Sequence, residues 1–159
     1  MAQNLVDSYL AYLESIRVPD DLPSDPDAAA DVLRRVQERV FHNPHLSASD
    51  DLDEMIATAP RSAWPLIAEI VDRAHAGDHA MLGAGVLQTF THMHAASFAD
   101  QLDEKIRTSD HFFRAFQYVA MTGVPLAIQQ RLNASLLARG ADPKLVVEYD
   151  ETEDDAAGP

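Results

Sequence analysis

Proline, glycine and helix-capping residues divide this chain into short segments, and this punctuation constrains the fold more than any other feature. Asp25-Pro26, Asn43-Pro44, Ala59-Pro60 and Gly140 are typical of helix boundaries. Between these boundaries, apolar residues recur every three or four positions, which is the spacing of one helix face. No segment reads convincingly as part of a β-sheet. The sequence therefore predicts an all-α fold, a compact bundle of about six to seven helices.

The expected helices and their caps follow from the same signals. The helices are expected over 4–17, 26–42, 47–57, 62–75, 79–95, 98–121 and 125–139. Their expected N-caps are Asn4, Asp25, Ser47 or Ser49, Ser62, Asp78 and Ser109. Short connections make consecutive helices antiparallel neighbours, so the last four helices are expected to form two stacked hairpins, as in HEAT repeats. No clean sequence repeat accompanies this pattern.

Two features in the middle of the chain predict close packing. Trp64 is expected to anchor the core, because large aromatic side chains dominate core energetics. Gly83 and Gly85 lie inside a helical pattern, where two glycines cost about 1–2 kcal/mol relative to alanine. Their segment lacks the third glycine of a dinucleotide-binding loop and the lysine of a phosphate loop. We expect a neighbouring helix to approach closely there, with the helix that bears Trp64 as the simplest candidate.

The length of the chain and its C-terminal composition predict the domain organisation. The 159 residues fit one domain, expected over 1–147. Residues 144–149 fit either a short strand or an extended segment. The acidic residues 148–159 are expected to form a disordered tail.

Acidic side chains are concentrated at the two ends of the chain, which has a net charge of −14. Residues 1–60 carry 12 acidic and 4 basic side chains, and residues 61–147 carry 8 of each. Residues 148–159 carry 6 acidic side chains and no basic ones. This distribution repels phosphate backbones and anionic lipid, so neither nucleic acid nor a membrane is an expected partner. It favours capture of a basic protein, or serves only solubility.

Several residue types and motifs are absent from the sequence, and their absence limits the functions that we expect of this chain. The chain has no cysteine, which excludes disulfides and thiolate chemistry. No apolar run is long enough for a membrane span, and the N-terminus does not read as a signal peptide, so a cytoplasmic location is expected. No nucleophile motif is present, and the carboxylates at 50–54 and 103–104 are explained by helix dipoles and solvent. No cofactor is expected.

Four of the seven histidines lie between residues 75 and 94, which raises the question of a metal site. His75 and His79 have a ligand-like spacing, but Gly77-Asp78 between them is a helix stop followed by a start. His92 and His94 point about 200° apart on a helix, so one ion cannot easily take both. We expect surface or capping histidines and no metal.

Several segments resemble a family of small bacterial helical proteins of unknown function. They are WPLIAEI at 64–70, LGAGVLQTF at 82–90, FADQLDEKI at 98–106 and DHFFRAF at 110–116. The resemblance covers about residues 60–120 and rests mostly on packing motifs. Val86 stands where that family has a proline. The resemblance implies a helical fold and leaves the activity open.

Three functional hypotheses remain. The first is a non-enzymatic acidic module of the immunity or antitoxin type that neutralises a basic protein. The second is a helical scaffold or adaptor that uses its charge only for solubility. The third is a metal-dependent enzyme that uses His75, His79 or His92. For the first, the expected partner-binding residues are Asp20, Asp21, Asp25, Asp50, Asp51, Asp53 and Glu54.

Overall fold

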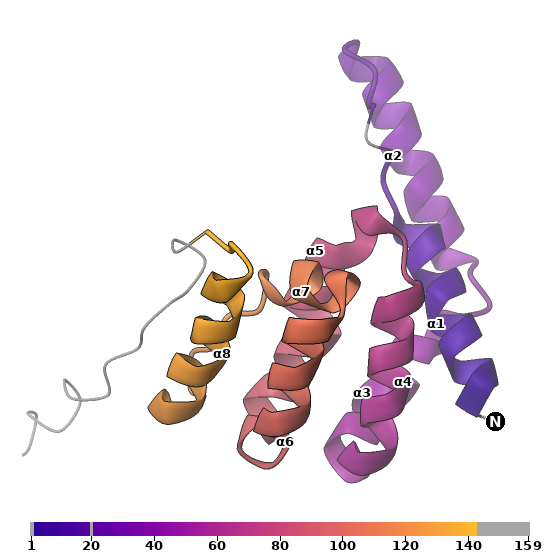
Figure 1. Ribbon diagram of the computed structural model, residues 1–159. Helices are drawn as coiled ribbons and strands as arrows, with labels where there is room; N and C mark the ends of the chain where they lie inside the picture. The colour runs from indigo at the N-terminus through magenta and orange to yellow at the C-terminus, as the bar shows by residue number, and fades with distance from the viewer. Residues whose placement is uncertain (1, 20, 143–159) are drawn as a thin grey trace, which may run out of the picture. The chain divides into compact units, whose positions relative to one another are not determined.

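The computed structural model describes residues 2–19 and 21–142 (Figure 1). Helices account for most of these residues and no strand occurs among them, which confirms the all-α fold class. The chain divides into two compact units, Met1–Asp78 and His79–Pro159. The single domain expected over 1–147 stays a prediction. The tail expected over 148–159, like the segment 144–149, lies outside the described residues.

In the first unit, α1 packs against each of the other three α-helices, and α3 packs against α4. The elements are α1 (Ala2–Ile16), α2 (Pro26–Phe41), α3 (Ser47–Thr58), α4 (Pro60–Arg73) and the 3-10 turn η1 (Ala76–Asp78). Fully buried side chains at helical spacing form the core of this unit: Val6, Leu13, Leu52, Ile56, Ile67, Ile70 and Val71. Figure 1 shows α2 continuing beyond the C-terminal end of α1.

Of the caps expected for the four α-helices of the first unit, one is confirmed and three are wrong. The carboxylate of Asp25 accepts hydrogen bonds from the backbone N–H groups of Asp27 and Ala28, with Pro26 as the first helical residue. Asn4 is not a cap, because α1 already begins at Ala2. The helix expected to start at a cap of Ser47 or Ser49 has Ser47 as its first helical residue, after the helical Leu46. The helix expected to start at a cap of Ser62 begins at Pro60, after Ala59. Proline at the first position presets the helical φ, so α4 starts without Ser62.

Some expected core positions are also wrong. Trp64 is only half-buried, because α4 directs the neighbouring Ala63 into the core and Trp64 lies about 100° further round the helix. The apolar spacing on α1 also predicts Leu5 as a core residue, but Leu5 is only half-buried and Val6 beside it is fully buried. On α2, the same spacing predicts Leu33 and Val36 in the core, but only Val36 is buried and Leu33 is exposed.

A buried ion pair joins the first and last elements of the first unit. Asp78, expected to cap a helix, instead has an exposed fraction of only 2%. Its two carboxylate oxygens accept hydrogen bonds from Nε and Nη2 of Arg17, at 2.8 and 2.6 Å. Such a bidentate pair is strong and directional. It fixes η1 against the end of α1.

The second unit contains one long helix between shorter ones. Its elements are α5 (His79–Leu82), the π-helical turn η2 (Gly83–Leu87), α6 (Gln88–Thr108), α7 (Asp110–Phe116) and α8 (Leu126–Ala138). The expected break near residues 96–97 is wrong, since α6 runs straight through it. The residues there, Ala-Ala-Ser, contain no helix breaker. The break falls instead at Gly85, whose backbone angles are not helical.

Within this unit, α7 lies beside α5 and η2, and α8 lies beside α6 (Figure 1). His79 contacts His111 and Gly83 lies against Ala115, so α7 runs along α5 and η2 in the same direction. Likewise, α8 runs along α6, since Arg131 contacts Asp100 and Arg139 reaches the carbonyl of residue 106. The packed pairs that run in the same direction in this unit are therefore α5 and η2 with α7, and α6 with α8. The segments 98–108 and 126–138 do pack together as expected, but in the same direction and not as an antiparallel hairpin. The pairing expected for 62–75 with 79–95 joins segments of the two units and stays a prediction.

Gly83 is where the close approach expected at the glycines occurs. A Cβ atom at this position would lie 2.1 Å from the backbone oxygen of Ala115 and 2.7 Å from Cβ of Tyr118. The approaching segment is therefore α7 and its end, and not the helix that bears Trp64. At Gly85 a Cβ would meet nothing within 4 Å.

The end of α8 follows its expected pattern. Gly140 has a φ of +83°, which glycine adopts without steric cost. Its N–H donates to the carbonyl of Leu137, and the N–H of Ala141 donates to that of Leu136. These two bonds form a Schellman motif, which confirms Gly140 as the residue just past the helix.

Asp103 on α6 is a buried carboxylate that holds α8 in place. It accepts hydrogen bonds from Oγ of Ser135 at 2.5 Å and from Nε and Nη2 of Arg131 at 3.2 and 3.0 Å. Arg107 on the same helix adds a bond at 2.8 Å. Burial raises the pKa of Asp103, but the bonds from Ser135 and Arg131 and the charge of Arg107 outweigh it and leave the pKa lowered.

Asp103→Asn should destabilise the protein at neutral pH and matter much less in strong acid. A lowered pKa means that Asp103 contributes stability above its unfolded pKa, about 3.9, and that this contribution is lost as the pH falls through the lower folded value. Urea midpoints of both proteins, compared at about pH 7 and below about pH 3, should therefore converge in acid. An equal difference at the two pH values would contradict the role of the charge.

Candidate partner-binding surface

The acidic residues predicted at 50–54 lie on the outer side of α3. Its inner side is fixed by Ala48, Leu52 and Ile56, which are buried at every fourth position. In the first unit α3 packs against α1 and α4, so the positions between these three residues face outward. The four acidic side chains there are all exposed: Asp50, Asp51, Asp53 and Glu54. We call these four residues the α3 acidic cluster.

The α3 acidic cluster is electrostatically unsatisfied. Partial burial raises the pKa of Asp53, and the neighbouring carboxylate of Asp50 raises it further. Beneath the cluster, burial and then the Asp53 charge raise the pKa of the Tyr9 hydroxyl, which places Tyr9 within the field of this carboxylate. No salt bridge within the described part of the chain involves a member of the cluster. An approaching cation would therefore relieve the repulsion between Asp50 and Asp53.

A hollow of about 230 Å³ adjoins the cluster. It lies between the N-terminal half of α1 and the start of α3, and Asp51 forms part of its wall. The other lining residues are Asn4, Leu5, Ser8, Pro44, His45, Ser47 and Ala48. Pockets for drug-sized ligands and cofactors are typically about 300–1,000 Å³, so this hollow suits a smaller group, such as one side chain.

The turn before α3 holds the far wall of this hollow. Asn43 donates from Nδ2 to Oγ of Ser15 at 2.6 Å and accepts at Oδ1 from the backbone N–H of His45 at 2.8 Å. These bonds link α1 to the turn, so the wall is fixed before any partner arrives. Sequence reasoning missed the hollow, because Asn4, Ser8 and His45 come from segments far apart in the chain.

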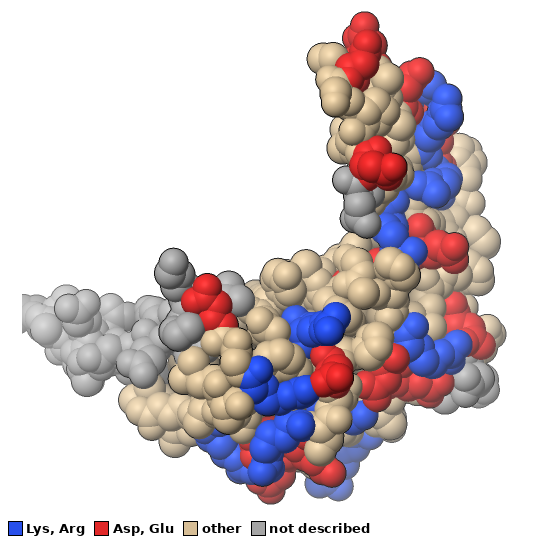
Figure 2. All heavy atoms as spheres, turned by 45° about the horizontal axis from the view of Figure 1, so that its top comes forward, with Lys and Arg blue, Asp and Glu red and all other residues tan. Residues whose placement is uncertain are grey.

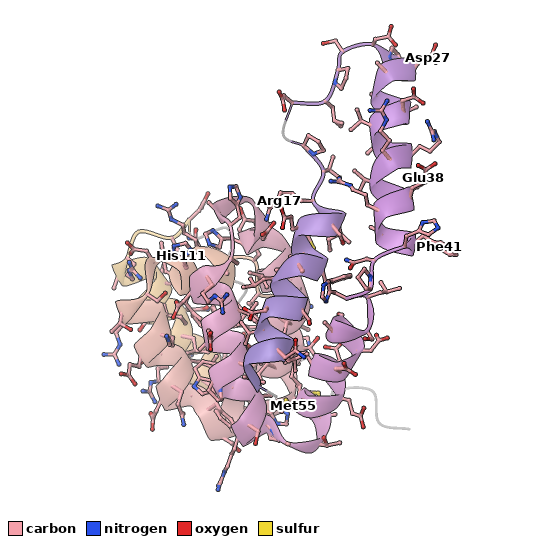
Figure 3. The ribbon with its side chains drawn as sticks, turned by 90° about the vertical axis from the view of Figure 1, so that its right-hand side faces the viewer. Arg17, Asp27, Glu38, Phe41, Met55 and His111 are labelled. Carbon is pink, nitrogen blue, oxygen red and sulfur yellow. The ribbon has the colours of Figure 1, made fainter. Side chains whose placement is uncertain are left out.

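Two of the aspartates predicted in the 20–25 loop, Asp21 and Asp25, lie apart from the α3 acidic cluster. Asp20 is outside the described residues, and Asp21 and Asp25 are exposed. Asp25 already serves as the cap of α2. Figure 3 shows Asp27, at the start of α2, and Met55, within α3, at opposite ends of the unit. The structure therefore does not bring the two groups of aspartates together.

The histidines of the metal-enzyme hypothesis contact different groups. His75, in the first unit, accepts at Nδ1 from the N–H of Gly77 at 3.1 Å. In the second unit, Nε2 of the buried His79 lies 3.1 Å from Nδ1 of His111, and Nε2 of His92 donates to the carbonyl of Ala120 at 3.0 Å. Over residues 2–19 and 21–142, no three histidine or carboxylate side chains gather as metal ligands would.

Comparison of the chain with protein-family models, with curated proteins and with solved structures finds no match. The resemblance over about residues 60–120 therefore stays an expectation. Within the described part of the chain, no helix has the length and apolar character needed to cross a lipid bilayer.

Proposed function

We propose that this chain is a protein-binding module that captures a basic protein partner through the α3 acidic cluster. The observation that carries the proposal is the cluster itself, four exposed carboxylates on one rigid helix beside a hollow sized for a single side chain. A lysine or arginine of the partner would enter the hollow beside Asp51. The remaining carboxylates would contact further basic groups around it.

We expect the α3 acidic cluster to act mainly on the rate of association with the partner. Exposed charges raise association rates and contribute less to the lifetime of a complex. The net charge of −14 adds long-range attraction toward a basic surface. An immunity or antitoxin role follows if the captured partner is a toxic enzyme whose basic surface is thereby covered.

A variant in which three carboxylates of the α3 acidic cluster are replaced by neutral amides tests the cluster directly. The triple replacement Asp51→Asn, Asp53→Asn and Glu54→Gln removes three negative charges. It leaves Asp50, because a negative charge in the first turn stabilises the helix by interacting with its dipole. We expect the association rate with the basic partner to fall by about tenfold or more at low salt, with a smaller change in dissociation rate. Surface plasmon resonance over a salt series measures both rates.

The matched control removes the same number of charges from scattered exposed positions, by Glu14→Gln, Asp27→Asn and Glu104→Gln. Its association rate should stay close to that of the unmodified chain. The partner itself is found by capture from extract of the native host, with the triple variant as the comparison bait. Equal capture by both baits, or an affinity that ignores salt, would refute the proposal.

A scaffold or adaptor function is the second candidate, and the exposed apolar residues of α2 favour it. Leu33 and Phe41 have exposed fractions of 42% and 82%. An adaptor that binds through such residues would keep its partner in high salt. The salt series therefore separates the two candidates.

A further inference from the structure

Two histidine rings of the second unit meet where α7 begins to run along α5. Nε2 of His79 lies 3.1 Å from Nδ1 of His111, and the two rings pack edge to face with their centroids 5.1 Å apart. His79 has an exposed fraction of only 5%, whereas His111 is exposed. Water therefore cannot readily replace the bond that Nε2 of His79 makes to its partner. We call these two residues the histidine pair.

The next contact along the same helices fixes the spacing at the histidine pair. Gly83 follows His79 by four residues and Ala115 follows His111 by four, so this contact lies about one helical turn further on. A Cβ atom on Gly83 would lie 2.1 Å from the backbone oxygen of Ala115, so the two backbones already touch there. The backbones at the histidine pair cannot separate while α7 stays packed on α5 and η2.

A hydrogen bond between two imidazole rings tolerates one positive charge but not two. A neutral ring has one N–H donor and one acceptor nitrogen, whereas a charged ring has two donors and no acceptor. Charging both rings leaves either two like charges in contact or an unbonded Nε2 on the buried His79. Both arrangements destabilise the packing of α7 on α5.

The charged side chains around the histidine pair do not offset a second positive charge. Neither α5 nor η2 carries an aspartate, glutamate, lysine or arginine. The charged residues of α7 and of the adjoining end of α6 are Asp103, Glu104, Lys105, Arg107, Asp110 and Arg114.

The carboxylates closest to the pair in the chain already have basic partners. Asp103 and Asp110 bond to arginines, and Asp78, which precedes His79, bonds to Arg17. Within residues 2–19 and 21–142, His111 forms no salt bridge. Figure 2 shows basic atoms interspersed with acidic ones on the face of the second unit that it displays, and not an extended acidic surface. A proton added to a second ring would therefore lack a carboxylate partner at His111.

We propose that the histidine pair is an acid-sensitive switch that holds α7 on α5 and releases it when both rings carry a proton. In the open state both rings titrate with the ordinary histidine pKa, about 6.5, whereas the closed state takes up at most one proton. The pair therefore adds stability above about pH 6.5, and this stability is lost as the pH falls below that value. Between about pH 7.5 and 5.5, exclusion of one proton should raise the equilibrium constant for opening about tenfold.

Hydrogen exchange of the α7 amides, followed by NMR, tests the switch. The protection factor, which is the exchange rate of an unstructured chain divided by the measured rate, reports the opening equilibrium at each pH. A helix of 7 residues is not stable without its packing, so release of α7 exposes its amides. The protection of the Phe113 N–H, which donates to the carbonyl of Ser109 at 3.0 Å, should fall about tenfold from about pH 7.5 to 5.5. Amides of α3 in the first unit are the internal reference and should change little.

Glutamine variants show whether the pair is the cause. His79→Gln and His111→Gln each leave one ring beside an amide that can donate or accept, so both should lose most of the pH dependence. His92→Gln is the matched control, because Nε2 of His92 donates to the carbonyl of Ala120 and a charged ring makes the same bond. This variant should keep the tenfold change. Loss of the dependence in His79→Gln alone would make burial of one ring the cause and would overturn the proposal.

The chemical shifts of the ring nitrogens in the unmodified chain give a measurement that does not depend on any variant. His79 and His111 should both become charged only as α7 loses protection. Two charged rings below about pH 6 with full protection of α7 would contradict the switch. So would a protection of α7 that stays constant from about pH 7.5 to 5.5.

Discussion

Arg17→Met should lower the free energy of unfolding of the first unit by about 3–5 kcal/mol, because Asp78 would keep a buried charge without its partner. Both carboxylate oxygens of Asp78 bond to the guanidinium, but the Arg17 side chain is 33% exposed, so we expect the lower part of this range. Trp64 is the only tryptophan of the chain and lies in α4, so its fluorescence during urea unfolding reports on this unit.

Two further variants show whether burial of the charge is the cause. Arg17→Met combined with Asp78→Asn should recover part of the loss, because the unpaired charge is gone. Arg73→Met removes two ion pairs of similar length, 2.7 Å to Asp7 and 3.0 Å to Glu69, but all three side chains are largely exposed. Exposed pairs contribute about 0–1 kcal/mol, so this variant should stay close to the unmodified chain. Equal losses for the two arginines would contradict the argument.

Gly83→Ala should also cost several kcal/mol, although it adds a single carbon. Overpacking of a tight contact typically costs about 1–3 kcal/mol and sometimes more. Here the new atom would meet the backbone oxygen of Ala115 at 2.1 Å, and a backbone atom cannot rotate away as a side chain can. The thermal midpoint followed by circular dichroism at 222 nm, a wavelength set by helix content, should fall clearly.

The neighbouring exposed residue supplies the control for this change. Ala84→Ser also adds one heavy atom but does so on the solvent side, and it should change the midpoint little. If Gly83→Ala were tolerated equally well, α7 would not approach as closely as the structure describes.

The sequence predicted those features of the fold that depend on neighbours along the chain. Asp25 with Pro26 caps α2, Ser109 caps α7 through a bond to the N–H of Phe112, and Gly140 ends α8. Each signal acts within one helical turn, so the local residues suffice to identify it. The all-α class follows from the sum of such signals.

Features that depend on distant residues could not be predicted in this way. Asp78 carried the local signal of a cap, but its buried environment comes from Arg17, 61 positions earlier. The glycine pattern predicted a close neighbour at Gly83 and could not identify it as α7, since nothing in the spacing specifies which helix approaches. Trp64 is of a residue type that is usually buried, yet its neighbour Ala63 is the residue of α4 that faces the core.

The same division applies to the candidate site. The outward direction of Asp50, Asp51 and Asp53 follows from the apolar spacing of Leu52 and Ile56 on the same helix. The adjoining hollow does not, because its walls combine α1 with the turn before α3. The separation of the 20–25 loop from the cluster likewise depends on the length and direction of α2.

Two connections of the second unit differ in how much added sequence they can absorb. Ser109 alone separates α6 from α7, its hydroxyl caps α7, and its carbonyl accepts from Arg139 at 3.0 Å. Any residue inserted there would break the cap and shift the alignment of α8 on α6. By contrast, Thr122 and Gly123 form an exposed tip between α7 and α8. An affinity tag, a fluorescent domain or the new termini of a circular permutant therefore belong at 122–123.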